Sequence, residues 1–129
     1  MARWAIDCAK RVLPYFEENF PDDIRPREAL LTLEKWIETG IFEMSVIRGA
    51  SLGSHSAARD VGEDAPARSA ARSAGQAVAT AHVKTHSFAA ANYALQAIHR
   101  DSDAQTADQS VIVERKWQHQ RLLDLNNTL

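Results

Sequence analysis

Two histidines in the second half of the chain have the spacing of a metal site. His82 and His86 are four residues apart, which on an α-helix places two imidazoles on one edge, where they can share an ion. His55 could supply a third ligand from a neighbouring helix. The zincin pattern, however, requires a glutamate directly after the first histidine, and Val83 stands there instead. We therefore predict no metal, with His82 packed over Gly75 and His86 closing the C-terminus of its helix.

Cys8 is the only cysteine and could act as a nucleophile beside a histidine from elsewhere in the fold. It lies between Trp4 and Val12 in an apolar series with helical spacing, which predicts a small buried hydrophobic residue instead. A single cysteine also excludes an intrachain disulfide, as is typical of reducing compartments, so we predict a cytoplasmic protein. The sequence has no glycine-rich phosphate loop and no Ser-His-Asp set. We predict no catalytic residue and no cofactor.

Negative charge is concentrated between residues 14 and 44. Eight acidic residues lie there against three basic ones, a local balance of −5 in a chain whose net charge is −2. Arg25 and Arg27 could hold a phosphate at a helix N-terminus, but Asp22, Asp23 and Glu28 balance their charge and predict salt bridges. An acidic surface can steer and select a basic partner, or it can simply be a solvated face that keeps the protein soluble. The candidate partner-binding residues are Glu17, Glu18, Asp22, Asp23 and Glu28.

A helix rich in alanine is predicted at the centre of the structure. Eight of the 17 residues from Ala65 to Ala81 are alanine, within a helical stretch that runs from Asp64 to His86. Asp64 would be its N-cap and Pro66 would lie in its first turn. Methyl groups on its buried face allow neighbouring helix axes to approach to the short end of the ~8–10 Å range. That face would contain Ala67, Ala70, Ala71, Ala74, Ala77, Val78 and Ala81, opposite Arg68, Arg72, Gln76 and Thr80.

Helical periodicity predicts five further helices and no strands, so the expected fold class is an all-α bundle of about six helices. The chain is long enough for one domain with a substantial core, and we expect a single domain over residues 1–129. Pro14 should kink or end the first helix, Gly40 should end the second, and Ser87 should cap the fifth. The expected ranges are 4–19, 26–39, 45–61, 64–86, a helix from 87 and 110–125, with 126–129 frayed. The third helix would bury Val46, Ile47, Ala50, Gly53, Ser54, Ala57 and Val61, and the sixth Val113 and Trp117.

Composition excludes several classes of protein. Hydrophobic residues make up 45% of the chain and charged residues 25%, as in soluble globular domains and unlike disordered chains. The small negative net charge does not favour non-specific nucleic-acid binding. No apolar run approaches the ~18 residues of a membrane span, and charges interrupt the N-terminus too often for a signal peptide.

Three stretches in combination resemble a family of small bacterial immunity proteins associated with polymorphic toxin systems. A looser match lies at Glu114–Leu122 (ERKWQHQRL). The resemblance implies an α-helical protein that binds and neutralises a cognate toxin, and it implies no catalytic residue. The three stretches are Trp4–Glu17 (WAIDCAKRVLPYFE), Pro21–Leu30 (PDDIRPREAL) and Ser69–Ala94 (SAARSAGQAVATAHVKTHSFAAANYA).

Two other functions are open at this point. One is a small helical metal- or ligand-binding protein that uses His55, His82 and His86. The other is a homo-oligomerising module, in which excess apolar surface is buried in a homodimer. The residues of that surface would be Trp36, Phe42 and Trp117.

Overall fold

Six α-helices and no strand make up residues 1–127, the part of the chain that this computed structural model describes. The predicted all-α bundle of about six helices is therefore confirmed. Within the same residues, no helix is both long enough and apolar enough to cross a membrane. The helices are α1 (Ala2–Glu17), α2 (Arg25–Thr39), α3 (Met44–Arg59), α4 (Pro66–Ala79), α5 (His86–Asp101) and α6 (Ala107–Asn127).

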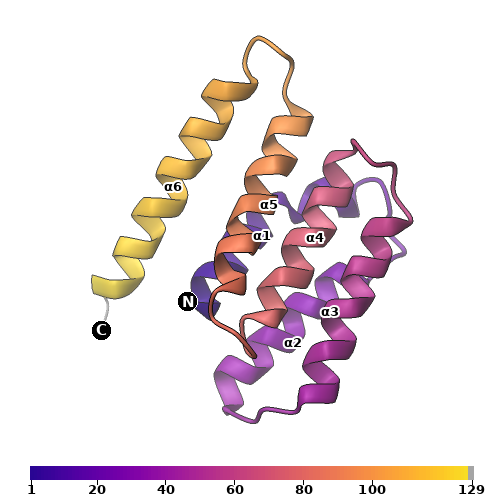
Figure 1. Ribbon diagram of the computed structural model, residues 1–129, viewed down its shortest axis with the longest axis vertical. Helices are drawn as coiled ribbons and strands as arrows, with labels where there is room; N and C mark the ends of the chain where they lie inside the picture. Colours follow the sequence, from indigo (N-terminus) through magenta and orange to yellow (C-terminus); the bar gives the residue numbers. More distant parts are fainter. Residues whose placement is uncertain (128–129) are drawn as a thin grey trace.

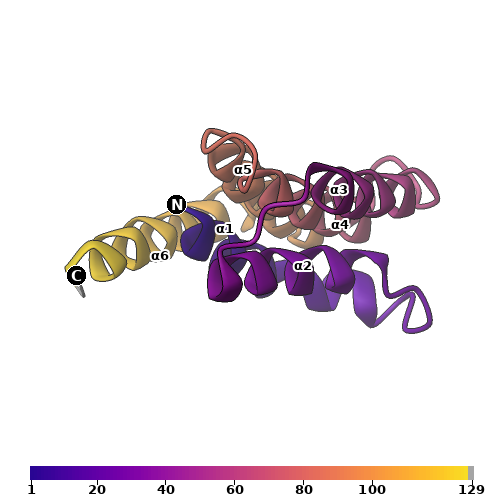
Figure 2. The same ribbon diagram turned by 90° about the horizontal axis from the view of Figure 1, so that it is seen from below.

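The alanine-rich helix α4 lies at the centre, as the sequence predicts. It contacts α1, α2, α3 and α5. Helices α3, α4 and α5 form one layer, α1 and α2 form a second layer against it, and α6 lies to one side against α1 and α5 (Figures 1 and 2). The predicted face of α4 is buried from Ala67 to Val78, and three residues beyond that face are buried too: Ser69, Ser73 and Gly75.

Serine hydroxyls join the three helices of the layer formed by α3, α4 and α5. Ser54 on α3 donates a hydrogen bond to the carbonyl oxygen of Ala71 at 2.7 Å, and Ser73 on α4 donates to that of Ala90 at 2.7 Å. A side chain this short reaches the main chain of the next helix only when the two helices approach closely. Small residues therefore set the spacing of the layer, and each buried hydroxyl is satisfied at the same time.

Helix α4 is shorter than predicted at its C-terminus. It ends at Ala79, and residues 80–85 form tight turns in which His82 N–H donates to Ala79 O at 3.0 Å and His86 N–H to Val83 O at 3.1 Å. No glycine or proline marks this end, but Thr80, Val83 and Thr85 are β-branched and have low helix propensity. Because His86 is the first residue of α5, the predicted shared helix edge of the two histidines is wrong.

Other boundaries and caps differ in smaller ways. Ala65, not Asp64, is the N-cap residue of α4, and Ser87 lies inside α5 instead of capping it. Of the two outcomes predicted for Pro14, a kink or an end, the end does not occur there: α1 continues to Glu17, and the Pro14 carbonyl accepts a hydrogen bond from Glu18 N at 2.9 Å. Gly40 ends α2 with a φ of 69°, as predicted. Of the residues expected to fray, 126 and 127 are helical, and 128–129 lie outside the described residues.

Helix α6 packs through polar groups. Its only buried side chains in the described residues are Ala107, Glu114 and Gln118. Glu114 accepts two hydrogen bonds from the Arg11 guanidinium, at 3.0 and 2.9 Å, and that guanidinium lies 4.1 Å from the centre of the Trp117 ring. The apolar stripe predicted on this helix is wrong for Val113, which is 56% exposed.

Gln118 extends this polar contact to α5. Its side-chain amide donates to the carbonyl oxygen of Ala91 at 3.0 Å, and its own main-chain carbonyl accepts a hydrogen bond from the Trp4 indole at 2.8 Å. On the exposed side of the contact, Arg121 binds Asp7 at 2.8 Å. Helix α6 is therefore held in one register by directional bonds, where an apolar stripe would permit sliding.

Substitution of Ala74 by leucine should destabilise the bundle. Ala74 is fully buried in α4, so the added carbon atoms have no space and the cost should be about 1–3 kcal/mol. Ala104→Leu, in the exposed turn before α6, is the control and should change stability by less than about 0.5 kcal/mol. Urea denaturation measures both. Equal midpoints for the two variants would mean that α4 is not tightly enclosed.

Substitution of Arg11 by alanine should loosen α6. The change leaves the buried Glu114 carboxylate without its partner, at a cost of about 2–4 kcal/mol. Lys10→Ala is the matched control: it removes one positive charge from the adjacent residue, which pairs with Glu34 at the surface, and should cost at most about 1 kcal/mol. Hydrogen exchange should show the loss of protection concentrated in α6. Uniform loss over all six helices would contradict this account.

Candidate functional site

The five acidic candidates gather at one end of the bundle. Glu17 and Glu18 lie where α1 ends, Asp22 and Asp23 lie in the connection, and Glu28 lies in the first turn of α2. We call this region the acidic end.

Two of the five carboxylates are neutralised by arginines of the same region. Arg27 binds Glu17 at 2.5 Å, and Arg25 binds both Asp23 at 2.7 Å and Asp60 of the α3 C-cap at 2.8 Å. The hydrogen bonds from Arg25 lower the pKa of the Asp23 carboxyl below its ordinary value. Both arginines therefore form salt bridges, as predicted, but only Arg25 pairs with a predicted partner, Asp23, whereas Arg27 pairs with Glu17.

The remaining three acidic candidates carry the uncompensated charge. Glu18, Asp22 and Glu28 are exposed and form no ion pair within residues 1–127. Two apolar side chains, Phe20 and Ile24, are exposed beside them, and the Phe20 ring lies 5.2 Å from that of Phe16. A charged rim next to exposed apolar side chains is a common composition for a protein-binding surface.

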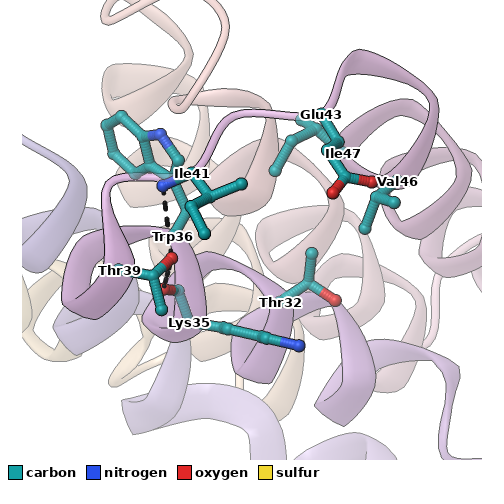
Figure 3. Close-up of a pocket in the computed structure, with 8 residues that line it drawn as sticks. All are labelled: Thr32, Lys35, Trp36, Thr39, Ile41, Glu43, Val46 and Ile47. Carbon is teal, nitrogen blue, oxygen red and sulfur yellow. Dashed lines mark hydrogen bonds between the residues drawn. The ribbon is translucent and has the colours of Figure 1, made fainter.

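A hollow lies between α2 and α3 (Figure 3). It is an open groove of about 300 Å³, which we call the α2–α3 groove. Ile47, buried, and Trp36, half-buried, are packed against the core, while Ile41 and Val46 are 65% and 50% exposed. This groove is not predicted from the sequence, and the predicted burial of Val46 is wrong. The groove is lined by Thr32, Lys35, Trp36, Thr39, Ile41, Glu43, Val46 and Ile47.

The loop that borders the groove is held in place by short-range bonds. After Gly40 reverses the chain, the Thr39 hydroxyl accepts a hydrogen bond from Ile41 N at 3.2 Å and donates one to Lys35 O at 2.8 Å (Figure 3). Phe42 stacks on His82 of the α4–α5 turn, with ring centres 6.4 Å apart. The only sequence signal for this surface is the pair of apolar residues that follow Gly40.

His55 packs over Gly75, where His82 was predicted to lie. Its ring covers Gly75, where a Cβ atom would lie only 2.8 Å from Nε2. Arg72 donates to Nδ1 of His55 at 2.9 Å, so the proton of the neutral ring is on Nε2. Burial, with the positive charges of Arg72 and Arg59 and the nearby His86, lowers the His55 pKa from 6.5 to about 4. His55 is therefore neutral at pH 7.

The other two histidines do not complete a metal site with His55. His86 binds the Gln76 side-chain oxygen through Nδ1 at 2.7 Å, and His82 is exposed against Phe42. Over residues 1–127, no three His, Cys, Asp or Glu side chains lie close enough to share an ion. The positive charges that lower the pKa of His55 would also repel a cation.

Cys8 and Trp4 are parts of the core, and the other two tryptophans are partly buried against it. Burial, with Asp7 and Glu114 nearby, raises the pKa of the Cys8 thiol to about 12, so the thiolate nucleophile is suppressed. The prediction of a small buried hydrophobic residue is confirmed. Trp117 packs beside Trp4 and Cys8, whereas Trp36 belongs to a different core cluster. Two of the three residues suggested for a homodimer, Trp36 and Trp117, therefore pack against different parts of the core.

Acidification should destabilise the protein through His55. Because the pKa of His55 is lower in the folded chain, its stabilising contribution is complete above pH 6.5 and is lost as the pH falls towards 4. For this partly buried ring we expect a loss on the order of 1–2 kcal/mol. His55→Gln should flatten the pH dependence of the unfolding free energy over this interval, and His119→Gln on α6 should keep the wild-type slope. Identical slopes for wild type and His55→Gln would show that folding does not lower the pKa of His55.

Comparison with known proteins identifies the family. A family model described as Imm-5 like putative immunity protein matches residues 1–125, nearly the whole chain. No curated protein and no solved structure gives a significant match. The resemblance noted in the sequence is thereby confirmed: this chain belongs to the Imm-5 like putative immunity protein family.

Proposed function

We propose that this chain binds a cognate bacterial toxin in the cytoplasm and neutralises it by occupying its surface, without catalysis. The single observation that carries this proposal is the family match over residues 1–125. An immunity protein of this kind needs a stable surface that is complementary to the toxin. It needs no reactive group of its own.

Two features of the molecule support binding over catalysis. The candidate reactive groups are occupied: Cys8 is a buried thiol, His55 accepts a hydrogen bond from Arg72, and His86 is bound to Gln76. Unpaired negative charge, by contrast, is exposed at the acidic end on Glu18, Asp22 and Glu28. A toxin that acts on nucleic acid carries a basic substrate cleft, and an acidic inhibitor gains association rate and specificity against such a cleft.

Co-expression provides the test of neutralisation. The proteins encoded by the genes adjacent to that of this chain are the candidate toxins. Cells that express the cognate toxin should survive when the chain is co-expressed and should die without it. The purified proteins should also form a complex on size exclusion. A toxin that kills equally in both cases, and that fails to bind the purified chain, would refute the proposed function.

The acidic end should control how fast the toxin associates. Glu18→Lys combined with Asp22→Lys should slow association by on the order of tenfold at low salt and weaken its dependence on ionic strength. These two residues are preferable to Glu17 and Asp23, whose reversal would also leave Arg27 and Arg25 without partners.

The matched control for this experiment reverses two exposed carboxylates on α6. Asp108→Lys combined with Asp124→Lys changes the net charge by the same amount but leaves the acidic end unchanged. Stopped-flow or surface plasmon resonance at several salt concentrations measures both pairs. If the two double variants slow association equally, the effect is one of net charge, and the acidic end is only a solvated face.

A further inference from the structure

A further hollow lies between the first half of α3 and the turn that joins α4 to α5, and we call it the α3–α4 hollow. Its residues from α3 are three and four positions apart, so they share one face of that helix. Its volume of about 180 Å³ is below the ~300–1,000 Å³ of pockets for drug-sized ligands, so it suits a single ring or branched chain. The apolar part of its lining is Met44, Ile47, Leu52 and Ala79.

The polar part of the lining contains no carboxylate. It consists of Arg48, Ser51, His82 and His86. Within residues 1–127, the Arg48 guanidinium forms no ion pair or hydrogen bond, and the ring of His82 forms no hydrogen bond. The carboxylate that is closest along the chain, Glu43, lines the α2–α3 groove instead. The hollow therefore offers one positive charge and unused hydrogen-bond donors to a ligand.

The elements around the hollow are held in place by bonds that leave these two groups free. The Ser51 hydroxyl donates to the carbonyl oxygen of Gly75 at 2.9 Å and so joins α3 to α4. His86 donates from Nδ1 to Gln76 Oε1 at 2.7 Å, and the ring of His82 stacks on Phe42 with ring centres 6.4 Å apart. Walls that are already ordered lower the entropic cost of binding.

The charge of the lining decides between three classes of ligand. A metal ion is disfavoured, because Arg48 would repel it and because no three His, Cys, Asp or Glu side chains of residues 1–127 lie close enough to share an ion. A phosphate monoester carries about −1.5 to −2 charges at pH 7, more than the single guanidinium balances. A carboxylate carries one negative charge, and a guanidinium can bind it through two parallel hydrogen bonds.

We propose that the α3–α4 hollow binds a carboxylate that carries one apolar group. Arg48 and His82 bind the carboxylate, and the apolar group packs against the apolar lining. This ligand site goes beyond the proposed function, and it is separate from the acidic end: the hollow lies at the start of α3, whereas Arg25 binds Asp60 at the C-cap of that helix. A free organic acid and the last residue of a polypeptide share this chemistry.

The test is a titration of the isotope-labelled chain, followed by NMR, with probes that differ in charge. Phenylacetate should shift amide signals around the hollow and saturate with a dissociation constant on the order of 1 mM. Phenethylamine, a cation of similar size, should bind at least about tenfold more weakly. N-acetylphenylalanine copies the end of a polypeptide. If it binds more tightly than phenylacetate, the ligand is a chain end, and if it binds more weakly, the ligand is a free acid.

Variants with matched controls locate the binding site. Arg48→Gln should weaken phenylacetate binding about tenfold, because the charged hydrogen bonds are lost. Arg59→Gln is its control and should stay within about twofold of wild type, since Arg59 is another exposed arginine of α3 with no ion pair in the described residues. Leu52→Ser should weaken binding by about fivefold through lost apolar contact. Its control is Leu31→Ser on α2, because Leu31 is 52% exposed and Leu52 is 58% exposed.

The outcomes separate specific binding from none. Saturable binding of phenylacetate that only Arg48→Gln and Leu52→Ser weaken, with melting curves that show folded variants, supports the inference. Equal affinity for phenylacetate and phenethylamine, equal weakening by both arginine variants, or a shift that grows without saturation overturns it. The toxin is absent from this experiment, so failure here leaves the proposed function standing.

Discussion

The close approach of α3, α4 and α5 is the constraint on which the rest of the structure depends. Alanine methyl groups fill the contact, and Ser54 and Ser73 donate hydrogen bonds directly to the main chain of the next helix. The same spacing leaves His55 in contact with the backbone at Gly75, where no side chain would fit. Small residues bury little area each, so the stability of this layer comes from tight packing and from satisfied polar groups.

Helix α6 is held against the bundle mainly by polar contacts. Its buried groups are polar, and the Arg11–Glu114 pair and the Gln118 bonds fix its register against α1 and α5. Such contacts contribute specificity of position more than net stability, because burial of a charged pair costs free energy that its attraction only partly offsets. The result is a helix in a defined position whose outer face, including Val113, stays exposed.

The acidic end and the α2–α3 groove lie at two of the connections between helices. The acidic end is formed where α1 passes into α2, and the groove is formed where α2 passes into α3. Side-chain bonds hold both connections: Arg25 ties Asp23 to Asp60 of the α3 C-cap, and the Thr39 hydroxyl bonds the loop after Gly40. A connection held in this way presents the unpaired charges of the acidic end in a defined position, which suits electrostatic steering of a partner.

The sequence by itself determined the fold class, the central position of α4 and the family, because alanine content and helical periodicity are local signals that survive in any tertiary context. It also determined that negative charge gathers near the start of α2. Tertiary structure alone decided which charges are paired: Arg25 reaches Asp60 across 35 positions in the chain. It likewise placed His55, not His82, over Gly75, and it exposed Val46. These outcomes depend on how helices dock, and docking is set by contacts between residues far apart in sequence, which no local pattern records.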